Sequence, residues 1–310
     1  MLKKKVMFFL GLGLFLASAV GAWAEDKAAT SWRPFDFSNG QVVFDVMLGG
    51  HPARALLDTG STGNAVSLPF LEAHEIPFRR VGKLEVGGVH ETAWTPIVGG
   101  IPLEFLGVKS EVGHAIGMQR TFPDLLLGQD FFKAGVVQID YPNRRLRLLA
   151  REGVDVGKFA NTTTRKHASS PFFEIRIKIE GEDAWLALDT GFSGALYLDR
   201  RLADDFEWNA VEPEKSGEGR GIHAVARHEL FRVDELDLGP VALSRVPVVV
   251  PAEGERFNMR GEFYTWRGGG QARAPRGLLG NQLLSPFLAT FDFKKGHLHL
   301  AMPSSKDAGS

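Results

Sequence analysis

The stretch that decides the fold is Phe44-x-Val46-x-Leu48-x-Gly50 followed by Ala53-Arg54-Ala55-Leu56-Leu57-Asp58-Thr59-Gly60. A counterpart lies 131 residues later, where Ile175-x-Ile177-x-Ile179-x-Gly181 leads into Ala184-Trp185-Leu186-Ala187-Leu188-Asp189-Thr190-Gly191. Each copy alternates apolar and polar residues, turns at a glycine and continues as an apolar run. This pattern predicts a β-hairpin whose second strand is buried. Each aspartate is therefore expected at the end of a buried strand.

A second matched pair of segments closes each half of the chain. Leu126-Leu127-Gly128-Gln129 corresponds to Leu278-Leu279-Gly280-Asn281, which follows 152 residues later. Apolar strands with a polar turn then end both halves, at 136–148 and 288–300. Because the offset has grown by about 21 residues, the second half should carry an insertion. We expect it at 252–276 and hypothesise that its aromatic residues pack over a substrate cleft and influence specificity.

Composition limits the classes of function. The 310 residues, 44% hydrophobic, are enough for two lobes. A formal net charge of −1 gives no overall field that would favour nucleic acid. The absence of cysteine excludes a thiolate nucleophile, a disulfide framework and cysteine-based metal sites.

The N-terminus is typical of an exported protein. Three lysines, an apolar run and Ala22-Trp23-Ala24 predict that residues 1–24 are a cleaved signal peptide, so the mature chain is expected in a periplasm or a secreted setting, with no membrane attachment. The repeats then predict an N-terminal lobe at 25–150, a linker at 151–170, a C-terminal lobe at 171–303 and a tail at 304–310. Short helices are expected after Ser67 and Asp199, which are suitable N-cap residues.

Two Asp-Thr-Gly turns in matched contexts predict a specific chemistry. If the halves pack about a pseudo-two-fold axis, Asp58 faces Asp189. Two adjacent carboxylates cannot both ionise cheaply, so the pair should hold one proton and provide a base and an acid together. Such a pair can activate a water against a peptide bond without a metal or an organic cofactor. We therefore expect a protein or peptide substrate, and a monomer is sufficient because both acids lie on one chain.

These segments resemble the aspartic peptidases of the pepsin and retropepsin kind, and most closely the bacterial exported members with two retropepsin-like halves on one chain. The resemblance covers about residues 40 to 302. It implies an all-β, bilobal, acid-protease-like fold with internal duplication and an active-site cleft between the lobes. Its active-site residues fall into the catalytic pair Asp58 and Asp189, supporting loop residues Thr59, Gly60, Ser61, Thr190 and Gly191, and supporting strand residues Leu127, Gly128, Leu279 and Gly280. The resemblance also implies that the two threonines hydrogen-bond across the lobes.

The sequence departs from that family in two places. Ser61 could donate a hydrogen bond to Asp58, but its counterpart is Phe192, which lacks a hydroxyl and should raise the pKa values of the pair. The hairpin that covers substrate in the family is expected near 86–95, with a partner near 219–230. Neither segment carries the tyrosine common in pepsins, so His90 or Trp94 is the candidate to replace it.

Other interpretations remain open at this point. Asp-Thr-Gly could form a capped turn without catalysis. The same fold could bind peptides without cleaving them, an alternative that Phe192 supports, and a two-carboxylate glycosidase ranks third. His297 and His299 could form a metal pair, although alternation on an edge strand explains them and no third ligand is evident. Asp140 and Asp292 are expected to begin the turns of the terminal hairpins.

Overall fold

The computed structural model describes residues 30–87, 92–166, 172–208, 213–220, 225–255 and 275–302. The expected signal peptide, the tail, His90 and residues 256–274 of the expected insertion lie outside the described residues. Within the described ranges, no helix is both long and apolar enough to cross a membrane.

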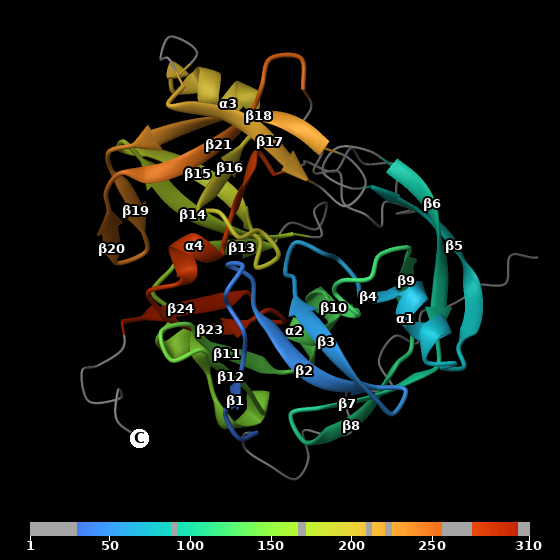
Figure 1. Cartoon of the computed structure of the whole chain (residues 1–310). Coiled ribbons are helices and arrows are strands. Elements are labelled where there is room, and N and C mark those ends of the chain that lie inside the picture. The colour runs from blue at the N-terminus through green and yellow to red at the C-terminus, as the bar shows by residue number, and fades with distance from the viewer. Residues whose placement is uncertain are drawn as a thin grey trace, which may run out of the picture.

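The first half of the chain forms one curled sheet, which we call the N-lobe sheet (Figure 1). Its strands follow the order β5 (Arg79–Gly87), β6 (Thr92–Gly99), β9 (Ala115–Met118), β4 (Ala65–Ser67), β10 (Leu125–Leu127), β3 (His51–Leu57), β2 (Val43–Leu48), β7 (Ile101–Phe105) and β8 (Val108–Val112). The predicted hairpin is β2 and β3, which pair antiparallel from Val43 opposite Leu56 to Leu48 opposite His51. Gly49 and Gly50, both at positive φ, make the turn.

The second half forms a corresponding C-lobe sheet. Its strands follow the order β17 (Lys215–Arg220), β18 (Val225–Val233), β21 (Val246–Pro251), β16 (Leu196–Leu198), β22 (Gly277–Leu279), β15 (Glu182–Leu188), β14 (Phe173–Ile179), β19 (Leu236–Leu238) and β20 (Val241–Leu243). Taken strand by strand, this order repeats that of the N-lobe sheet. Here β14 and β15 form the predicted hairpin, with Gly181 at its turn.

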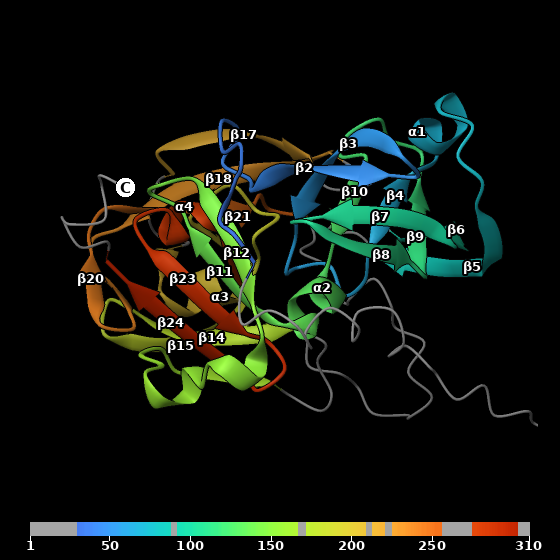
Figure 2. The same ribbon diagram turned by 90° about the horizontal axis from the view of Figure 1, so that it is seen from below.

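A third sheet joins the lobes (Figure 2). It has the order β1 (Arg33–Pro34), β12 (Arg145–Leu149), β11 (Val136–Asp140), β23 (Leu288–Asp292) and β24 (His297–Ala301). The predicted terminal hairpins of the two halves meet here, because β11 pairs antiparallel with β23. Gln138 lies directly opposite Thr290, its own equivalent at the offset of 152, and donates a hydrogen bond to the Thr290 hydroxyl at 2.9 Å. The paired strands β11 and β23 are therefore related by an approximate two-fold axis through this pair.

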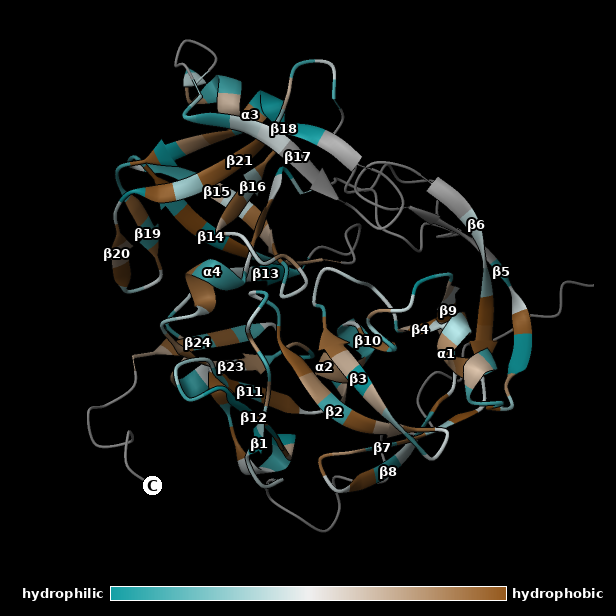
Figure 3. Cartoon of the chain, viewed as in Figure 1, coloured by the Kyte–Doolittle hydropathy of each residue, from teal (hydrophilic) through white to brown (hydrophobic). Residues whose placement is uncertain are grey.

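The strand pattern explains why these segments fold as they do. In β2 the burial alternates, whereas Ala55, Leu56 and Leu57 at the end of β3 are all buried, as the continuous apolar run predicts. Hydrophobic stretches, brown in Figure 3, follow strands such as β14 and β15. Matching buried runs end β15 at Leu186, Ala187 and Leu188. The prediction of an all-β, acid-protease-like fold is confirmed.

The helices are short and begin where predicted. The Ser67 hydroxyl accepts a hydrogen bond from Phe70 N at the start of α1 (Leu68–Ala73), and the Asp199 carboxylate accepts one from Leu202 N at the start of α3 (Arg200–Asp205). Two further helices, α2 (Gln129–Ala134) and α4 (Asn281–Leu284), follow the two Leu-Leu-Gly segments.

The segment predicted as a linker has structure of its own. Residues 151–153 and 156–158 form single 3₁₀ turns, and β13 (Thr164–Lys166) pairs with β14 at the margin of the C-lobe sheet. A salt bridge between Arg165 and the buried Glu174, with a shortest distance of 2.5 Å, accompanies that pairing. Residues 164–166 are thus attached to the C-lobe sheet, whereas Arg151 donates to the Gly135 carbonyl and Thr162 donates to the Leu298 carbonyl of β24.

Candidate active site

The two Asp-Thr-Gly turns leave equivalent strands of the two lobes. Asp58 directly follows β3, and Asp189 directly follows β15. Next to each turn runs the parallel strand of a Leu-Leu-Gly segment, β10 beside β3 and β22 beside β15. Asp58 N donates to the Leu127 carbonyl at 3.0 Å, and Asp189 N donates to the Leu279 carbonyl at 2.9 Å. Both aspartates are therefore fixed by the strand alongside them.

The two carboxyl groups face each other between the lobes. Each carboxyl group changes the pKa of the other. A Cβ atom added to Gly60 would lie 2.5 Å from the Asp189 carboxyl carbon, and one added to Gly191 would lie 2.5 Å from that of Asp58. Each turn thus brings its glycine against the aspartate of the other turn. Glycine is required at both positions because any larger residue would occupy the space of the opposite carboxylate.

The two threonines tie these turns together. The Thr59 hydroxyl donates to the Leu188 carbonyl at 2.7 Å and accepts from Thr190 N at 3.0 Å. Reciprocally, the Thr190 hydroxyl donates to the Leu57 carbonyl at 3.0 Å and accepts from Thr59 N at 3.0 Å. Both residues are completely buried. The bonds that cross between the lobes thus lie immediately beside the dyad, where they set the separation of the carboxylates.

Backbone amides hold one oxygen of each carboxylate. Ser61 N donates to Asp58 Oδ1 at 3.0 Å, while Gly191 N and Phe192 N donate to Asp189 Oδ1 at 2.8 and 3.1 Å. These bonds favour the charged form and oppose the effect of burial.

Burial dominates the protonation of the pair. It raises the pKa of Asp58 above the ordinary value, and burial together with the nearby Asp58 charge raises the pKa of Asp189 well above it. Since each charge disfavours the other, the two groups titrate as one unit. A proton shared by the pair is the physical consequence.

The structure shows how the two turns differ at Ser61 and Phe192. The Ser61 hydroxyl is buried and donates a hydrogen bond to the Gly63 carbonyl at 2.8 Å, and its expected bond to the Asp58 carboxylate stays a prediction. Phe192 is half-buried, packs with Leu278 and makes an edge contact with Tyr197 at a ring-centre distance of 6.2 Å. The Phe192 side chain therefore forms part of an apolar cluster beside Asp189.

Gly128 and Gly280 allow the strands to approach the turns closely. A Cβ atom on Gly128 would lie 2.1 Å from the Gly63 carbonyl oxygen, and one on Gly280 would lie 2.4 Å from the Gly194 carbonyl oxygen. Gly128 N donates to the Asn64 side chain at 3.0 Å, and Gly280 N donates to the Ala195 carbonyl at 2.9 Å. These contacts explain the Leu-Gly pairs that the sequence repeats.

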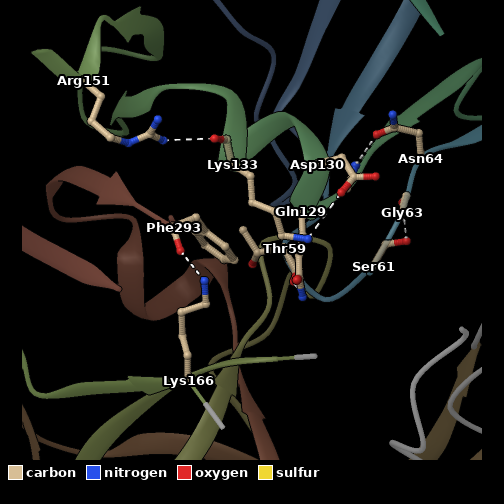
Figure 4. A network of polar contacts seen from close by, with 11 residues as sticks. Thr59, Ser61, Gly63, Asn64, Gln129, Asp130, Lys133, Arg151, Lys166 and Phe293 are labelled. Atoms are coloured by element: carbon tan, nitrogen blue, oxygen red, sulfur yellow. Dashed lines mark hydrogen bonds and ion pairs between the residues drawn. The ribbon is translucent and has the colours of Figure 1, made fainter. Parts of the chain in front are cut away.

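Sequence reasoning missed two residues that support the turns, Gln129 and Asn281. Both come immediately after the Leu-Leu-Gly segments and are almost fully buried. The Gln129 side-chain amide donates to the Thr59 carbonyl at 3.1 Å, and Figure 4 shows it beside that turn. The signal was available, since a polar amide side chain recurs at the same place in both repeats.

Asn281 makes the more extensive network. Its side-chain amide donates to the Thr190 carbonyl at 2.6 Å and to the Gly40 carbonyl at 3.0 Å, and its oxygen accepts from the Tyr141 hydroxyl at 2.8 Å. Burial raises the pKa of Tyr141, so this phenol stays protonated and donates. Asn281 thus connects the Asp189 turn to the N-terminal segment and to the end of β11.

The expected substrate-covering hairpins have counterparts in the fold. β5 and β6 form one antiparallel hairpin, and β17 and β18 form the other. The Trp94 side chain on β6 is 66% exposed, and the Lys83 ammonium lies 5.4 Å from the centre of its ring. The role of Trp94 over a substrate stays a prediction.

The remaining polar candidates lie away from the dyad. Asp140 accepts from Asn143 N and Asp292 accepts from Lys295 N, so both begin terminal turns, as predicted. His297 and His299 alternate along β24. Among the described residues, no three histidine or acidic side chains are grouped so as to hold a metal.

This geometry can be compared with known proteins. Residues 175–283 match the aspartyl protease family. The match supports an aspartyl protease and covers the Asp189 turn, Leu279-Gly280 and Asn281, whereas the Asp58 turn lies outside it. No curated protein matches the chain.

Proposed function

We propose that the chain is an aspartic endopeptidase with two retropepsin-like halves, in which Asp58 and Asp189 form the catalytic dyad. The observation that carries the proposal is the reciprocal geometry of the turns. Each glycine lies against the opposite carboxylate, and each threonine hydroxyl bonds across to the other turn. A turn with a purely structural role would not need a second buried carboxylate against it.

The proposed reaction uses the dyad as a combined base and acid. The ionised carboxylate takes a proton from a water molecule as its oxygen attacks the peptide carbonyl carbon. The protonated carboxyl group gives its proton to the carbonyl oxygen, which forms a tetrahedral diol. When the diol collapses, the protonated carboxyl group gives its proton to the nitrogen, the ionised carboxylate takes the proton of one diol hydroxyl, and the C–N bond breaks. The products are a carboxylic acid and an amine, and the dyad again holds one proton. The backbone amides that bind the carboxylates keep them oriented during these transfers.

The raised pKa values of the pair define the expected pH range. One proton must remain on the dyad, so activity requires a pH below the higher pKa of the pair and above the lower one. Burial raises both values, so the active range extends to higher pH than for an ordinary, exposed carboxyl pair.

The decisive experiment compares the mature chain with Asp58→Asn and Asp189→Asn. Each would be incubated with an unfolded protein substrate between about pH 3 and 7, and cleavage would be followed by mass spectrometry. We expect cleavage by the unaltered chain and loss of at least about a thousandfold in either variant. Turnover that survives in one variant would refute a shared dyad.

A peptide-binding module of the same fold is the second candidate, and Phe192 is the observation that favours it. If the unaltered chain binds peptides without cleaving them, and Asp189→Asn binds them equally well, this second function replaces the first. A glycosidase is ranked below both because its two carboxylates need not be symmetric.

Export is part of the same proposal. A cleaved signal peptide at 1–24 would place the enzyme in a periplasm or secreted, where it would act as a monomer on proteins or peptides. N-terminal sequencing of the exported protein tests this, and an intact Met1 would contradict it.

A further inference from the structure

A pocket of about 320 Å³ is formed by residues of the first half of the chain. It is lined by Asp36, Ser38, Asn39, Gln41, Val43, Arg54 and Phe122. Val43 also belongs to an apolar cluster with Leu56 and Leu126, which shortly precede Asp58 and Gly128. The pocket and the catalytic turns are thus connected through neighbouring side chains.

The inner wall of the pocket is bonded to the catalytic turn of the other lobe. The Gln41 side-chain amide donates to the Gly191 carbonyl at 2.5 Å, and the carbonyl of its chain neighbour Gly40 accepts from the Asn281 side chain at 3.0 Å. A Cβ atom on Gly40 would lie 2.9 Å from the Ser193 side chain, so the two segments are in close contact. One residue that lines the pocket is therefore bonded directly to the Asp189 turn.

The charge of the pocket is set by Asp36 and Arg54. The Arg54 guanidinium divides between two carboxylates, Asp36 at 3.1 Å and Asp45 at 3.3 Å, so one positive charge serves two negative ones. The Asp36 side chain is 46% exposed and can accept a further donor. Ser38 N donates to Asp36 Oδ1 at 2.9 Å, and this bond lowers the pKa of the carboxyl group and favours its charged form.

An aromatic ring lines the same pocket. Phe122 is 47% exposed, although it is a large apolar side chain. A lysine or arginine side chain is suited to such a pocket, because its aliphatic stem packs on a ring while its cationic end reaches a carboxylate.

We propose that this pocket is a substrate subsite for a basic side chain, lysine or arginine, a few residues from the bond that is cleaved. A peptide extended through the site would place alternate side chains on the same face, so one of them can enter the pocket while the chain passes the dyad. This proposal rests on the proposed peptidase function and adds the class of side chain that its substrate carries.

The test uses paired synthetic peptides that differ only in lysine or norleucine at one position, scanned across the cleavage site. Norleucine keeps the aliphatic stem and removes the charge. We expect one position at which the unaltered chain prefers lysine, and we expect Asp36→Asn to reduce that preference about three- to tenfold in kcat/KM. Asp45→Asn is the matched control, because it also removes a carboxylate from Arg54 but lies outside the pocket. It should keep the preference.

Other results would overturn the proposal. These are the absence of a lysine preference at every position, or a preference that Asp36→Asn leaves unchanged. A binding measurement separates the subsite from catalysis: labelled lysine and norleucine peptides are titrated onto Asp189→Asn with and without Asp36→Asn. If no peptide is cleaved but lysine still binds better through Asp36, the peptidase proposal fails and the subsite stands. Equal binding of both peptides refutes the subsite itself.

Discussion

The two lobes use the same strand order to present the same turn, but they surround that turn differently. In the N-lobe, Ser61 follows the turn and Gln129 supports it. In the C-lobe, Phe192 packs into an apolar cluster and Asn281 reaches both Tyr141 and Gly40. The threonine bonds and the close approach of each glycine to the opposite carboxylate are the same in both lobes, and they hold the carboxylates together. What differs lies around each aspartate and can make the two acids unequal.

The largest effect should come from breaking the reciprocal contact itself. Gly60→Ala and Gly191→Ala each place a methyl group within about 2.5 Å of the opposite carboxylate, so we expect each to lower kcat/KM by at least about a hundredfold. Gly113→Ala is the control, because a Cβ atom there meets nothing within 4 Å and the residue lies outside the turns and the hairpins expected to cover substrate. Retained activity in either turn variant would contradict a functional dyad.

The next largest effect should come from removing the threonine hydroxyls that bond across the two turns. Thr59→Val and Thr190→Val keep the shape of the side chain but leave a buried amide and a buried carbonyl without their partner. We expect each to lower the free energy of unfolding by about 2–4 kcal/mol, measured by urea titration. Since both hydroxyls belong to one network, the double variant should cost less than the sum of the two. Strict additivity would show that the two bonds act independently.

The supporting side chains Gln129 and Asn281 should contribute differently to the stability of the protein. Asn281→Ala removes bonds to Thr190, Gly40 and Tyr141, whereas Gln129→Ala removes the bond to Thr59. We therefore expect Asn281→Ala to cost about 1–2 kcal/mol more in unfolding free energy. Tyr141→Phe removes one of the hydrogen bonds of Asn281, so it should lower the free energy of unfolding by less than Asn281→Ala does. Equal losses for Gln129 and Asn281 would show that the difference in bonding has no energetic consequence.

Stability should depend on pH through the dyad. A carboxyl group with a raised pKa in the folded state binds more protons there than in the unfolded chain, so stability falls as pH rises from the ordinary value to the raised one. Above that range the stability lost through ionisation of the buried carboxyl group no longer changes with pH. We expect Asp189→Asn to unfold at a higher temperature than the unaltered chain at pH 7, with the gain shrinking toward pH 4. A gain that does not change with pH would exclude the dyad as its cause.

The smallest effect should come from exchanging the residue after the C-lobe turn. Phe192→Ser gives the Asp189 turn the hydroxyl that the Asp58 turn has. A hydroxyl near the charged pair favours its ionised form, so we expect the pH profile of cleavage to move to lower pH by less than about one unit. The reciprocal Ser61→Ala should move it the other way. No shift in either variant would show that these hydroxyls lie outside the electrostatics of the dyad.

Much of this arrangement could be predicted from sequence because it rests on local patterns. Alternation and apolar runs predicted the hairpins at 43–57 and 173–188, and the residues after Ser67 and Asp199 form the predicted helices. The bonding of residues 164–166 to the C-lobe sheet could not be predicted, because a short polar segment has no periodicity that distinguishes a marginal strand from a loop. The polar pocket was also missed, since its residues come from three separate segments of the chain.

The sequence by itself determined that there are two equivalent strands ending in Asp-Thr-Gly and that each is accompanied by a Leu-Leu-Gly strand. Only the tertiary structure decided that each turn places its glycine against the opposite carboxylate, that Gln129 and Asn281 support the turns, and that Gln41 joins a pocket to the Asp189 turn. The physical reason is the distance along the chain between the residues that interact. Strand periodicity is a property of neighbouring residues, whereas the position of a carboxylate against a glycine 131 residues away depends on how two finished sheets pack.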